Sequence, residues 1–257
     1  MIALVTGASS GIGRDIAIYL NRLGHDLVIT GREEANLKQL QKQLQENGKQ
    51  RVEVVIADLT DTKQCIELYQ RAVELYGKID ILINNAGFGL FGAFVETDLE
   101  TELAMIDTNI KAVHTLTKLA MKDMTERDQG YILNVSSVAG FLPGPLMSTY
   151  YGTKNYVFRF TEAIREELKK KKSKVQISVL CPGPVATNFN EVAKVKFNLR
   201  QRKSEEVAKY AVDHMLKKQF VIMPGIEIKV ARFFSKVVPD SILAEFCYHM
   251  QEKKKGV

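Results

Sequence analysis

A tyrosine and a lysine four residues apart, Tyr150 and Lys154, form the pair in this sequence best suited to proton transfer. On a helix, two residues at this spacing lie on one face about one turn apart. A tyrosine with an ordinary pKa of about 10 is a poor acid or base at neutral pH. A nearby ammonium group stabilises the phenolate. We therefore predict that Lys154 lowers the pKa of Tyr150, which would make the pair an acid–base catalyst.

Tyr151 competes for that role, because it lies three residues before Lys154 and is also within helical reach. Spacing alone leaves the two tyrosines as alternatives. Each residue also has a purely structural explanation, as a half-buried tyrosine or a solvated lysine. Two serines upstream, Ser136 and Ser137, follow a strand-like stretch and would face opposite ways on a strand.

A glycine-rich segment lies between the first strand-like and the first helix-like stretch. It runs Thr6-Gly7-Ala8-Ser9-Ser10-Gly11-Ile12-Gly13. Glycine lets the backbone turn sharply and approach a pyrophosphate, and the start of the following helix supplies N–H donors. A tight turn without a ligand is the alternative. The position between strand and helix favours a dinucleotide-binding loop.

The end of the second strand-like stretch bears on the choice of nucleotide. NAD-binding proteins of this fold place an acidic residue there, which bonds the ribose 2′-hydroxyl. Here residues 26–30 are followed by Gly31 and Arg32. Arg32 could pair with a 2′-phosphate, whereas Glu33 and Glu34 suit the start of the next helix. We predict NADP(H) rather than NAD(H), with a surface arginine at a helix start as the alternative.

Strand-like and helix-like segments alternate along the whole chain. The expected strands are 2–6, 26–30, 51–56, 79–83, 131–135, 175–180 and 219–222. The expected helices are 12–23, 33–47, 61–76, 100–126, 148–172 and 204–216. Several strands are continuous apolar runs, typical of strands buried on both faces. The pattern predicts an α/β fold: a doubly wound, Rossmann-like, mostly parallel seven-stranded sheet with helices on both faces.

No linker, low-complexity stretch or repeat divides the chain. We therefore expect residues 1–257 to form a single dinucleotide-binding oxidoreductase domain. Within it we expect a substrate flap near 184–204. A C-terminal helical extension is expected near 226–255, as one or two helices around Pro239.

Composition and charge exclude several other classes of protein. With 46% hydrophobic and 26% charged residues, the chain is ordinary for a globular enzyme and is not disordered. The net charge of +6 raises the question of nucleic-acid binding. However, the lysine runs 169–172 and 253–255 stand at expected helix ends, where solvated cations are favoured. An acidic partner and a membrane surface are the alternatives for these runs. With no tryptophan and no basic–aromatic interleaving, we expect no nucleic-acid partner.

The expected location is cytoplasmic. Cys65, Cys181 and Cys247 form no CxxC pair, which fits a reducing compartment, and no metal site is predicted. Met1 leads directly into the first expected strand, so we expect no signal peptide. No stretch approaches the ~20 apolar residues of a spanning helix.

The glycine loop has the spacing Gly-x3-Gly-x-Gly, and in this it resembles the short-chain dehydrogenase/reductase family. The resemblance covers about the first 190 residues and is to the NADP-preferring branch with TGxxxGxG and YxxxK motifs. The family's Tyr-x3-Lys motif selects Tyr150 over Tyr151. Ser137, thirteen residues upstream, agrees with the family's serine-to-tyrosine spacing.

The resemblance implies a catalytic role for four residues. Ser137 would donate a hydrogen bond to the substrate carbonyl, and Tyr150 would deliver the proton as hydride arrives at carbon. Lys154 would lower the tyrosine pKa and hold the nicotinamide ribose. Asn109 matches the family's fourth member, which anchors a proton-relay water through helix backbone. Asparagine is unfavourable inside a helix, which supports a role for it.

The resemblance also implies the remaining cofactor contacts. Asp58 would bind the adenine, although its chemistry alone also permits a helix cap. The segments Asn84–Gly87 and Pro182–Thr187 resemble the family's NNAG motif and PG loop, of which the second fixes the nicotinamide for pro-S transfer. The asparagines of the NNAG motif would tie neighbouring loops together. The implied cofactor-binding residues are Gly7, Ser9, Ser10, Gly11, Ile12, Gly13, Arg32, Asp58, Leu59, Asn85, Ala86, Gly87, Tyr150, Lys154, Pro182, Gly183, Val185 and Thr187.

Apolar side chains near the expected nicotinamide site indicate a hydrophobic substrate, or alternatively core or interface packing. They are Phe88, Leu90, Phe91, Phe94, Phe141, Leu142, Pro143, Leu146, Met147, Phe189 and Phe197. The cations of the flap are either solvated or bind an anionic head group; they are Lys194, Lys196, Arg200, Arg202 and Lys203. The tail 230–250 is expected first to cover the active site, second to pack on a subunit, and third to lie on a membrane surface.

Together these features predict an NADP(H)-dependent oxidoreductase that reduces a carbonyl, or oxidises the alcohol, of an apolar small molecule. A non-catalytic NADP(H)-binding sensor or scaffold is the alternative, and the presence of all four catalytic residues disfavours it. Pairing through the helices 100–126 and 148–172, as in the family, implies a homodimer or homotetramer.

Overall fold

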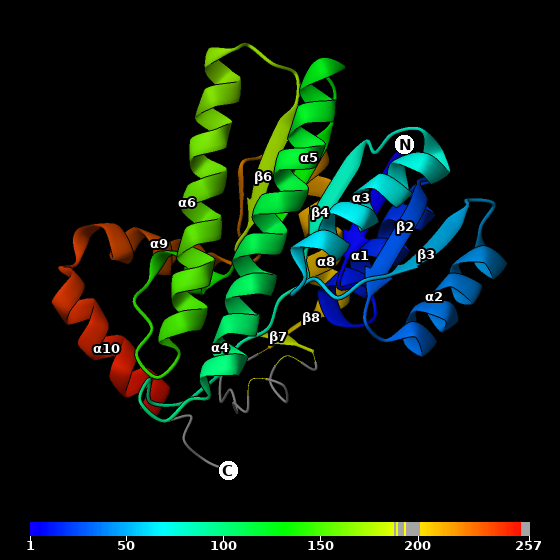
Figure 1. Ribbon diagram of the computed structural model, residues 1–257. Coiled ribbons are helices and arrows are strands. Elements are labelled where there is room, and N and C mark those ends of the chain that lie inside the picture. Colours follow the sequence, from blue (N-terminus) through cyan, green and yellow to red (C-terminus); the bar gives the residue numbers. More distant parts are fainter. Residues whose placement is uncertain (188, 190–192, 194–200, 253–257) are drawn as a thin grey trace.

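Seven parallel strands form the central sheet of the computed structural model (Figure 1). The structure describes residues 1–187, 189, 193 and 201–252. The strands are β1 (Ile2–Thr6), β2 (Asp26–Gly31), β3 (Val52–Ile56), β4 (Ile81–Asn84), β5 (Tyr131–Val135), β6 (Gln176–Leu180) and β9 (Val221–Ile222). Their order is β3-β2-β1-β4-β5-β6-β9, which confirms the predicted fold class. Since the order reverses between β1 and β4, a crevice for a ligand is expected at the carboxyl ends of these strands.

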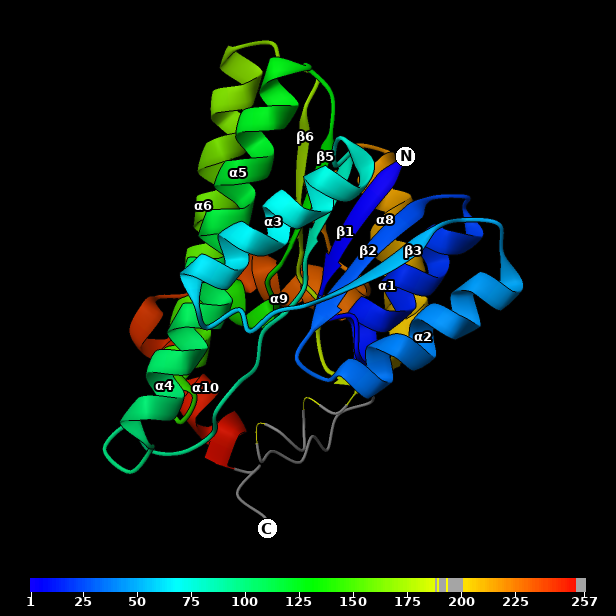
Figure 2. The same ribbon diagram turned by 45° about the vertical axis from the view of Figure 1, so that its right-hand side comes forward.

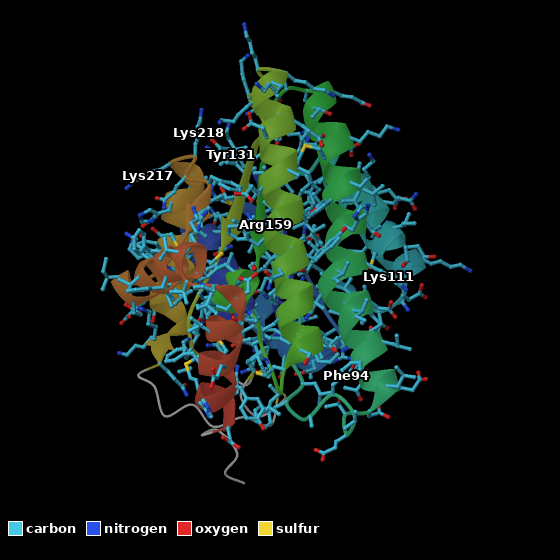
Figure 3. The ribbon with its side chains drawn as sticks, turned by 90° about the vertical axis from the view of Figure 1, so that its left-hand side faces the viewer. Phe94, Lys111, Tyr131, Arg159, Lys217 and Lys218 are labelled. Atoms are coloured by element: carbon cyan, nitrogen blue, oxygen red, sulfur yellow. The ribbon has the colours of Figure 1, made fainter. Side chains whose placement is uncertain are left out.

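Helices cover both faces of the sheet (Figure 2). On one face lie α1 (Gly11–Arg22), α2 (Glu34–Asn47) and α8 (Ser204–Leu216). On the other lie α3 (Thr62–Tyr76), α5 (Val113–Glu126) and α6 (Ser148–Lys170). Two terminal helices, α9 (Ile226–Val237) and α10 (Asp240–Glu252), follow β9 and lie beside one end of α6 (Figure 3). They flank Pro239, as predicted.

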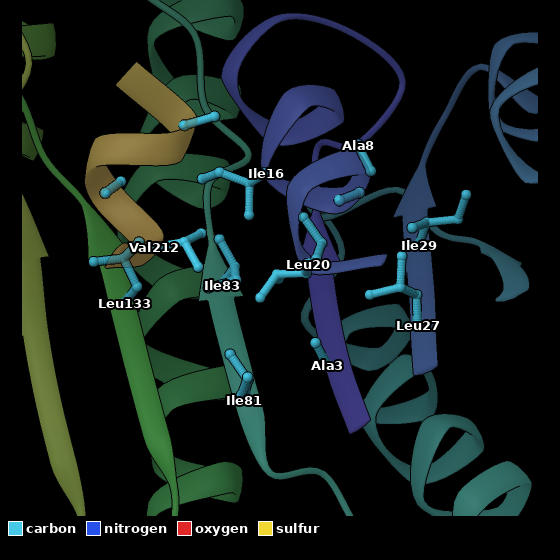
Figure 4. Packing of buried hydrophobic residues seen from close by; sticks show 14 of the residues in the cluster. Ala3, Ala8, Ile16, Leu20, Leu27, Ile29, Ile81, Ile83, Leu133 and Val212 are labelled. Atoms are coloured by element: carbon cyan, nitrogen blue, oxygen red, sulfur yellow. The ribbon is translucent and has the colours of Figure 1, made fainter. Parts of the chain in front are cut away.

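Alternating side chains of the strands feed two separate cores. In β1, Ala3 and Val5 join the core under α1 and α8, whereas Leu4 joins the core under α3 and α5. Figure 4 shows Leu20 of α1 and Val212 of α8 in the first of these cores. Burial on both faces explains why inner strands such as β1 and β4 are largely apolar runs, whereas the edge strand β3 is only half-buried and contains Glu53.

Helices α1 and α8 are joined by polar contacts as well as by apolar packing. The Tyr19 hydroxyl donates to the Asp213 carboxylate at 2.7 Å. Lys209 donates to the same carboxylate at 2.8 Å. Residues almost two hundred positions apart in the chain therefore fix the helix that follows the glycine loop.

The expected helix 100–126 is interrupted. It consists of α4 (Leu99–Ile106), a π-helical segment (Asp107–Ala112) and α5. A π-helical turn adds one residue to the α-helical repeat and occurs often at functional sites. Asn109 lies within this segment and is fully buried.

The predicted flap 184–204 is described at its ends and at residues 189 and 193. Val185–Ala186 (β7) and Arg202–Lys203 (β8) pair as a small parallel sheet. Lys194, Lys196, Phe197 and Arg200 lie outside the described residues, as do Lys253–Lys255. Among the described helices, none combines the length and the apolar character needed to cross a membrane. The cysteines Cys65, Cys181 and Cys247 are buried and form no disulfide bond.

Candidate active site

A cavity of about 1290 Å³ lies at the carboxyl ends of the strands. Its wall contains the residues that directly follow the first five strands, Gly7, Arg32, Ala57, Asn85 and Ser136, and Pro182, the second residue after β6. One part of the wall is the glycine loop. The opposite part is built from the apolar side chains of α9 and α10.

The glycine loop has the shape of a phosphate cradle. Gly7 has a φ of +63°, and a Cβ there would lie 2.9 Å from the Ala86 Cα. A Cβ on Gly13 would collide with the Gly7 carbonyl oxygen. Asn85 ties this loop to β4, since its side-chain amide donates to the carbonyls of Thr6 at 2.9 Å and Gly7 at 3.2 Å. The asparagine thus links neighbouring loops as the resemblance implied.

The N-terminus of α1 faces this cradle without a side-chain cap. Ser10 occupies the N-cap position but makes no capping hydrogen bond, and the first turn holds no acidic residue. Ser9, Ser10, Gly11 and Ile12 all line the cavity. The backbone N–H groups at the helix start, together with the helix dipole, therefore suit an anion such as a phosphate.

Arg32 and Asp58 lie where the second and third strands end. Arg32 is exposed and lines the cavity, and the neighbouring Glu33 is the N-cap of α2. One carboxylate oxygen of Asp58 accepts hydrogen bonds from the backbone and hydroxyl of Thr60, both at 3.0 Å. The cap of α3 is Asp61, so the alternative that Asp58 caps this helix is wrong.

Tyr150, Lys154 and Ser137 lie close together in the cavity wall. Lys154 Nζ lies 5.8 Å from the centroid of the Tyr150 ring and donates to the Val135 carbonyl at 3.0 Å. Burial lowers the pKa of Lys154 to about 8. Burial also raises the pKa of Tyr150 to about 12, against the opposing effect of a hydrogen bond with Ser137. The prediction of a lowered Tyr150 pKa is therefore wrong for this structure, because burial outweighs the effect of neighbouring groups.

Tyr151 and Ser136, the neighbours of Tyr150 and Ser137 in the sequence, make hydrogen bonds with other partners. The Tyr151 hydroxyl accepts a hydrogen bond from Gln251 of α10 at 2.7 Å. Ser136 Oγ donates to the Lys154 carbonyl at 2.8 Å and is almost fully buried. Ser136 thus fixes the backbone of α6, and Tyr151 joins α6 to α10. The geometry places Tyr150, and not Tyr151, beside Ser137 and Lys154.

Asn109 lies behind the cavity wall rather than on its surface. Its side chain donates to the Phe88 carbonyl at 2.9 Å and the Thr153 hydroxyl at 3.0 Å, and accepts from the Phe88 N–H at 3.1 Å. A Cβ on Gly87 would lie 2.7 Å from Asn109 Oδ1 and 3.3 Å from Lys154 Nζ. Asn109 therefore holds the loop after β4 against α6, next to Lys154.

The cavity gathers nearly all of the residues predicted to bind the cofactor. Besides those described above, Leu59, Ala86, Gly87, Pro182, Gly183, Val185 and Thr187 line it. Gly13 is the exception, because it lies beneath the loop against Gly7. Thr187 reaches the glycine loop, since a Cβ on Gly11 would lie 3.0 Å from its methyl group.

The apolar end of the cavity matches the prediction only in part. Phe88, Leu142, Met147 and Phe189 line it as expected. Leu90, Phe91, Phe94, Phe141, Pro143 and Leu146 are not part of its wall. The first of the three expectations for the tail is confirmed, because α9 and α10 cover this end. Lining residues that were not expected from the sequence include Thr108, Val138, Ala139, Glu206 and Ile228.

Comparison with known sequences adds a family likeness. Residues 1–196 match the family model of the short chain dehydrogenase. An uncharacterized oxidoreductase of Staphylococcus saprophyticus is 38% identical over 186 residues, which are 72% of this chain and 79% of that protein. The part of this chain that matches the family model ends before α8, α9 and α10 begin.

Solved structures share the fold over most of its length. A short chain dehydrogenase/reductase from Burkholderia phymatum, in complex with NAD, has a TM-score of 0.83 at 25% identity and covers 91% of this chain and 92% of its own. A short-chain dehydrogenase from Sphingobium yanoikuyae, in complex with NADPH, has a TM-score of 0.83 at 29% identity and covers 92% and 91%. This likeness extends beyond the part that the family model matches.

Proposed function

This chain belongs to the short chain dehydrogenase family, and we propose that it is an NADP(H)-dependent oxidoreductase that reduces a carbonyl group of an apolar small molecule, or oxidises the corresponding alcohol. The observation that carries the proposal is the position of Tyr150. It lines the cavity beside Ser137 and Lys154, and its ring lies 5.3 Å from that of Phe189 in the apolar part of the wall.

The cradle fits a nicotinamide dinucleotide. A side chain on Gly7 or Gly13 would fill the space that the loop leaves open, and the uncapped start of α1 suits a pyrophosphate. The two similar structures contain NAD in one case and NADPH in the other, so the fold alone allows both. Arg32 supports NADP(H), since a guanidinium at this position can pair with a 2′-phosphate.

The bound dinucleotide would supply or accept the hydride, and the residues of the chain handle the proton. With a pKa near 12, Tyr150 keeps its proton at neutral pH and can donate it to a carbonyl oxygen. Ser137 can donate a hydrogen bond to the same oxygen as negative charge develops there. Lys154, with a pKa near 8, is mostly protonated at neutral pH and stabilises the phenolate left on Tyr150. A tyrosine that rests in its protonated form suits the reductive direction.

The test is NADPH oxidation with a panel of ketones, aldehydes, quinones and 3-oxoacyl thioesters, with NADH in parallel. We expect oxidation with NADPH and at least one apolar carbonyl. Tyr150→Phe should lower the rate by about 10²–10⁴-fold, since only the proton donor is removed, and NADPH binding followed by fluorescence should persist. Tyr151→Phe is the matched control and should retain turnover. Inactivation by Tyr151→Phe alone would contradict the assignment, and NADPH binding without turnover on any substrate would favour a sensor.

A further inference from the structure

The outer face of α9 carries an uncovered stripe of large apolar side chains. Ile226, Val230, Phe233 and Val237 are 71%, 46%, 63% and 60% exposed. Steps of four, three and four residues place them on one side of the helix. The opposite side packs inward through Ile228, which is 5% exposed. A surface helix normally turns its single apolar stripe to the core, so α9 has a second apolar side that the described chain leaves uncovered.

This stripe adjoins the entrance of the cavity. Phe234, Ile242 and Phe246 line the cavity, yet they are 51%, 57% and 64% exposed. A side chain that lines the cavity and is also exposed to solvent marks a place where the cavity reaches the surface. The rings of Phe233 and Phe234 lie 5.9 Å apart, which joins the stripe to the entrance. The apolar surface is thus continuous from the outer side of α9 to the interior of the cavity. The two helices are seen together beside α6 in Figures 1 and 3.

Cations flank the stripe on α9. Lys229 and Lys236 are exposed, and at about 100° per residue both lie roughly 80° to one side of the centre of the stripe. The one acidic residue of this helix, Glu227, lies on the other side and is paired with Arg202 at 2.8 Å. Arg232 turns inward, with its guanidinium 5.1 Å from the centroid of the Phe158 ring.

The acidic residues of α10 lie beside the entrance. Asp240 and Glu252 are about 120° around the helix from Phe246, and Glu252 lies 3.7 Å from His249. Glu245 is nearer, about 100° from Phe246 and about 60° from Ile242. On α9 itself, the charged residue nearest to the centre of the stripe is Lys229, about 70° away.

We propose that this face, formed by the α9 stripe with Ile242 and Phe246 of α10, binds the surface of an anionic lipid bilayer. An apolar stripe flanked by lysines is complementary to such a surface, because the side chains can enter the boundary of the acyl chains while the ammonium groups meet the headgroups. The cavity would then open toward lipid. A lipophilic carbonyl compound could reach Tyr150 without crossing water, and this last step rests on the proposed function.

The test of binding uses the full chain and flotation with vesicles, one set of phosphatidylcholine with phosphatidylglycerol and one of phosphatidylcholine alone. We expect binding to the anionic set and much weaker binding to the neutral set. Lys229→Glu/Lys236→Glu should weaken binding by at least about 25-fold, since each lysine near an anionic surface contributes about fivefold. Phe233→Gln/Val237→Gln should weaken it by a similar factor, and both positions are exposed, so folding should be unaffected.

Two control variants match these changes elsewhere on the surface. Lys63→Glu/Lys217→Glu has the same charge, and Leu23→Gln/Ile56→Gln removes two exposed apolar side chains. Both should bind vesicles like the unchanged protein apart from a small effect of net charge. Equal losses in the control variants would overturn the assignment to α9. So would an absence of binding to anionic vesicles, or a dimer that Phe233→Gln/Val237→Gln converts to monomers.

A second measurement separates this inference from the proposed function. With a lipophilic ketone dissolved in the vesicles, the KM should be at least several-fold lower for the unchanged protein than for Phe233→Gln/Val237→Gln. With a water-soluble carbonyl compound, the two should have equal KM values. Equal KM values for the lipophilic ketone would overturn substrate entry through lipid. Because flotation needs no catalysis, a protein that floats but turns over no substrate would contradict only the proposed function.

Discussion

Replacing Lys154 by methionine should stabilise the folded protein while it abolishes turnover. Burial lowers the pKa of Lys154 from its ordinary 10.5 to about 8. At 1.36 kcal/mol per pH unit, this shift means that the buried ammonium destabilises the folded state by about 3 kcal/mol. The full effect applies at any pH where Lys154 is protonated in both the folded and the unfolded protein. Methionine has a similar length and carries no charge. It leaves the Val135 carbonyl without its lysine donor, which costs about 1 kcal/mol.

The expected net effect near pH 7 is a gain of about 2 kcal/mol, or a rise in Tm of about 4–8 °C. The gain depends on pH in a definite direction. The unfolded chain holds the lysine proton up to its higher pKa, so the cost of burial is full below pH 8 and disappears as the pH rises toward 10.5. Near pH 10 the cost has fallen to about 1 kcal/mol, and the advantage of Lys154→Met should vanish.

Urea denaturation without added nucleotide, at both pH values, measures these differences. Lys63→Met is the control, because this lysine is exposed and its loss should change the stability by no more than about 0.5 kcal/mol. If Lys154→Met lost stability near pH 7, or gained the same amount at both pH values, the buried ammonium would not be the source of the cost.

Three further variants test other parts of the site. Arg32→Ala should weaken NADPH binding by about 10–100-fold and leave NADH binding nearly unchanged, as charge-assisted hydrogen bonds are worth about 1.5–3 kcal/mol; equal losses in titrations of the two nucleotides would refute the 2′-phosphate contact. Gly13→Ala should abolish nucleotide binding in the same titrations, because the new methyl group collides with the Gly7 carbonyl; undiminished affinity would mean that the cradle tolerates the shift. Asn109→Ala should lower the free energy of unfolding by about 2–4 kcal/mol, since it leaves the Phe88 N–H and the Thr153 hydroxyl without this partner. A loss below about 0.5 kcal/mol in urea denaturation would argue that Asn109 does not hold the loop after β4 against α6.

The sheet could be predicted from sequence because its strands are buried on both faces. The run Ile81-Leu82-Ile83 is fully buried, and no polar residue interrupts it. The boundaries of the strands could not be predicted in the same way, since Ile79 is equally buried but precedes β4. Hydropathy reports burial and not hydrogen bonding, so it extended this strand by two residues.

The break in the long helix could not be predicted in the same way. A π-helical turn adds one residue without a glycine or proline to mark it. The one available signal was Asn109, whose polar side chain is unfavourable at a buried position inside a helix. Its hydrogen bonds to Phe88 and Thr153 explain why it is tolerated there.

The direction of the Tyr150 pKa shift could not be predicted from the sequence either. Spacing identifies a lysine one turn away, but it does not tell how far either group is removed from water. The walls of the cavity come from segments as distant as the glycine loop and α10. Only their assembly shows that Tyr150 is buried, and burial decides its pKa.

The contact between α1 and α8 has a consequence for how the protein folds. The Tyr19–Asp213 hydrogen bond closes a loop of 194 residues, and contacts of such long range slow folding. Until α8 has been synthesised, Ile16 and Leu20 of α1 lack part of the apolar surface that covers them. A nascent chain therefore leaves one side of the helix of its nucleotide cradle uncovered until residues 204–216 have been synthesised. Such transiently exposed apolar surface is the kind that chaperones bind.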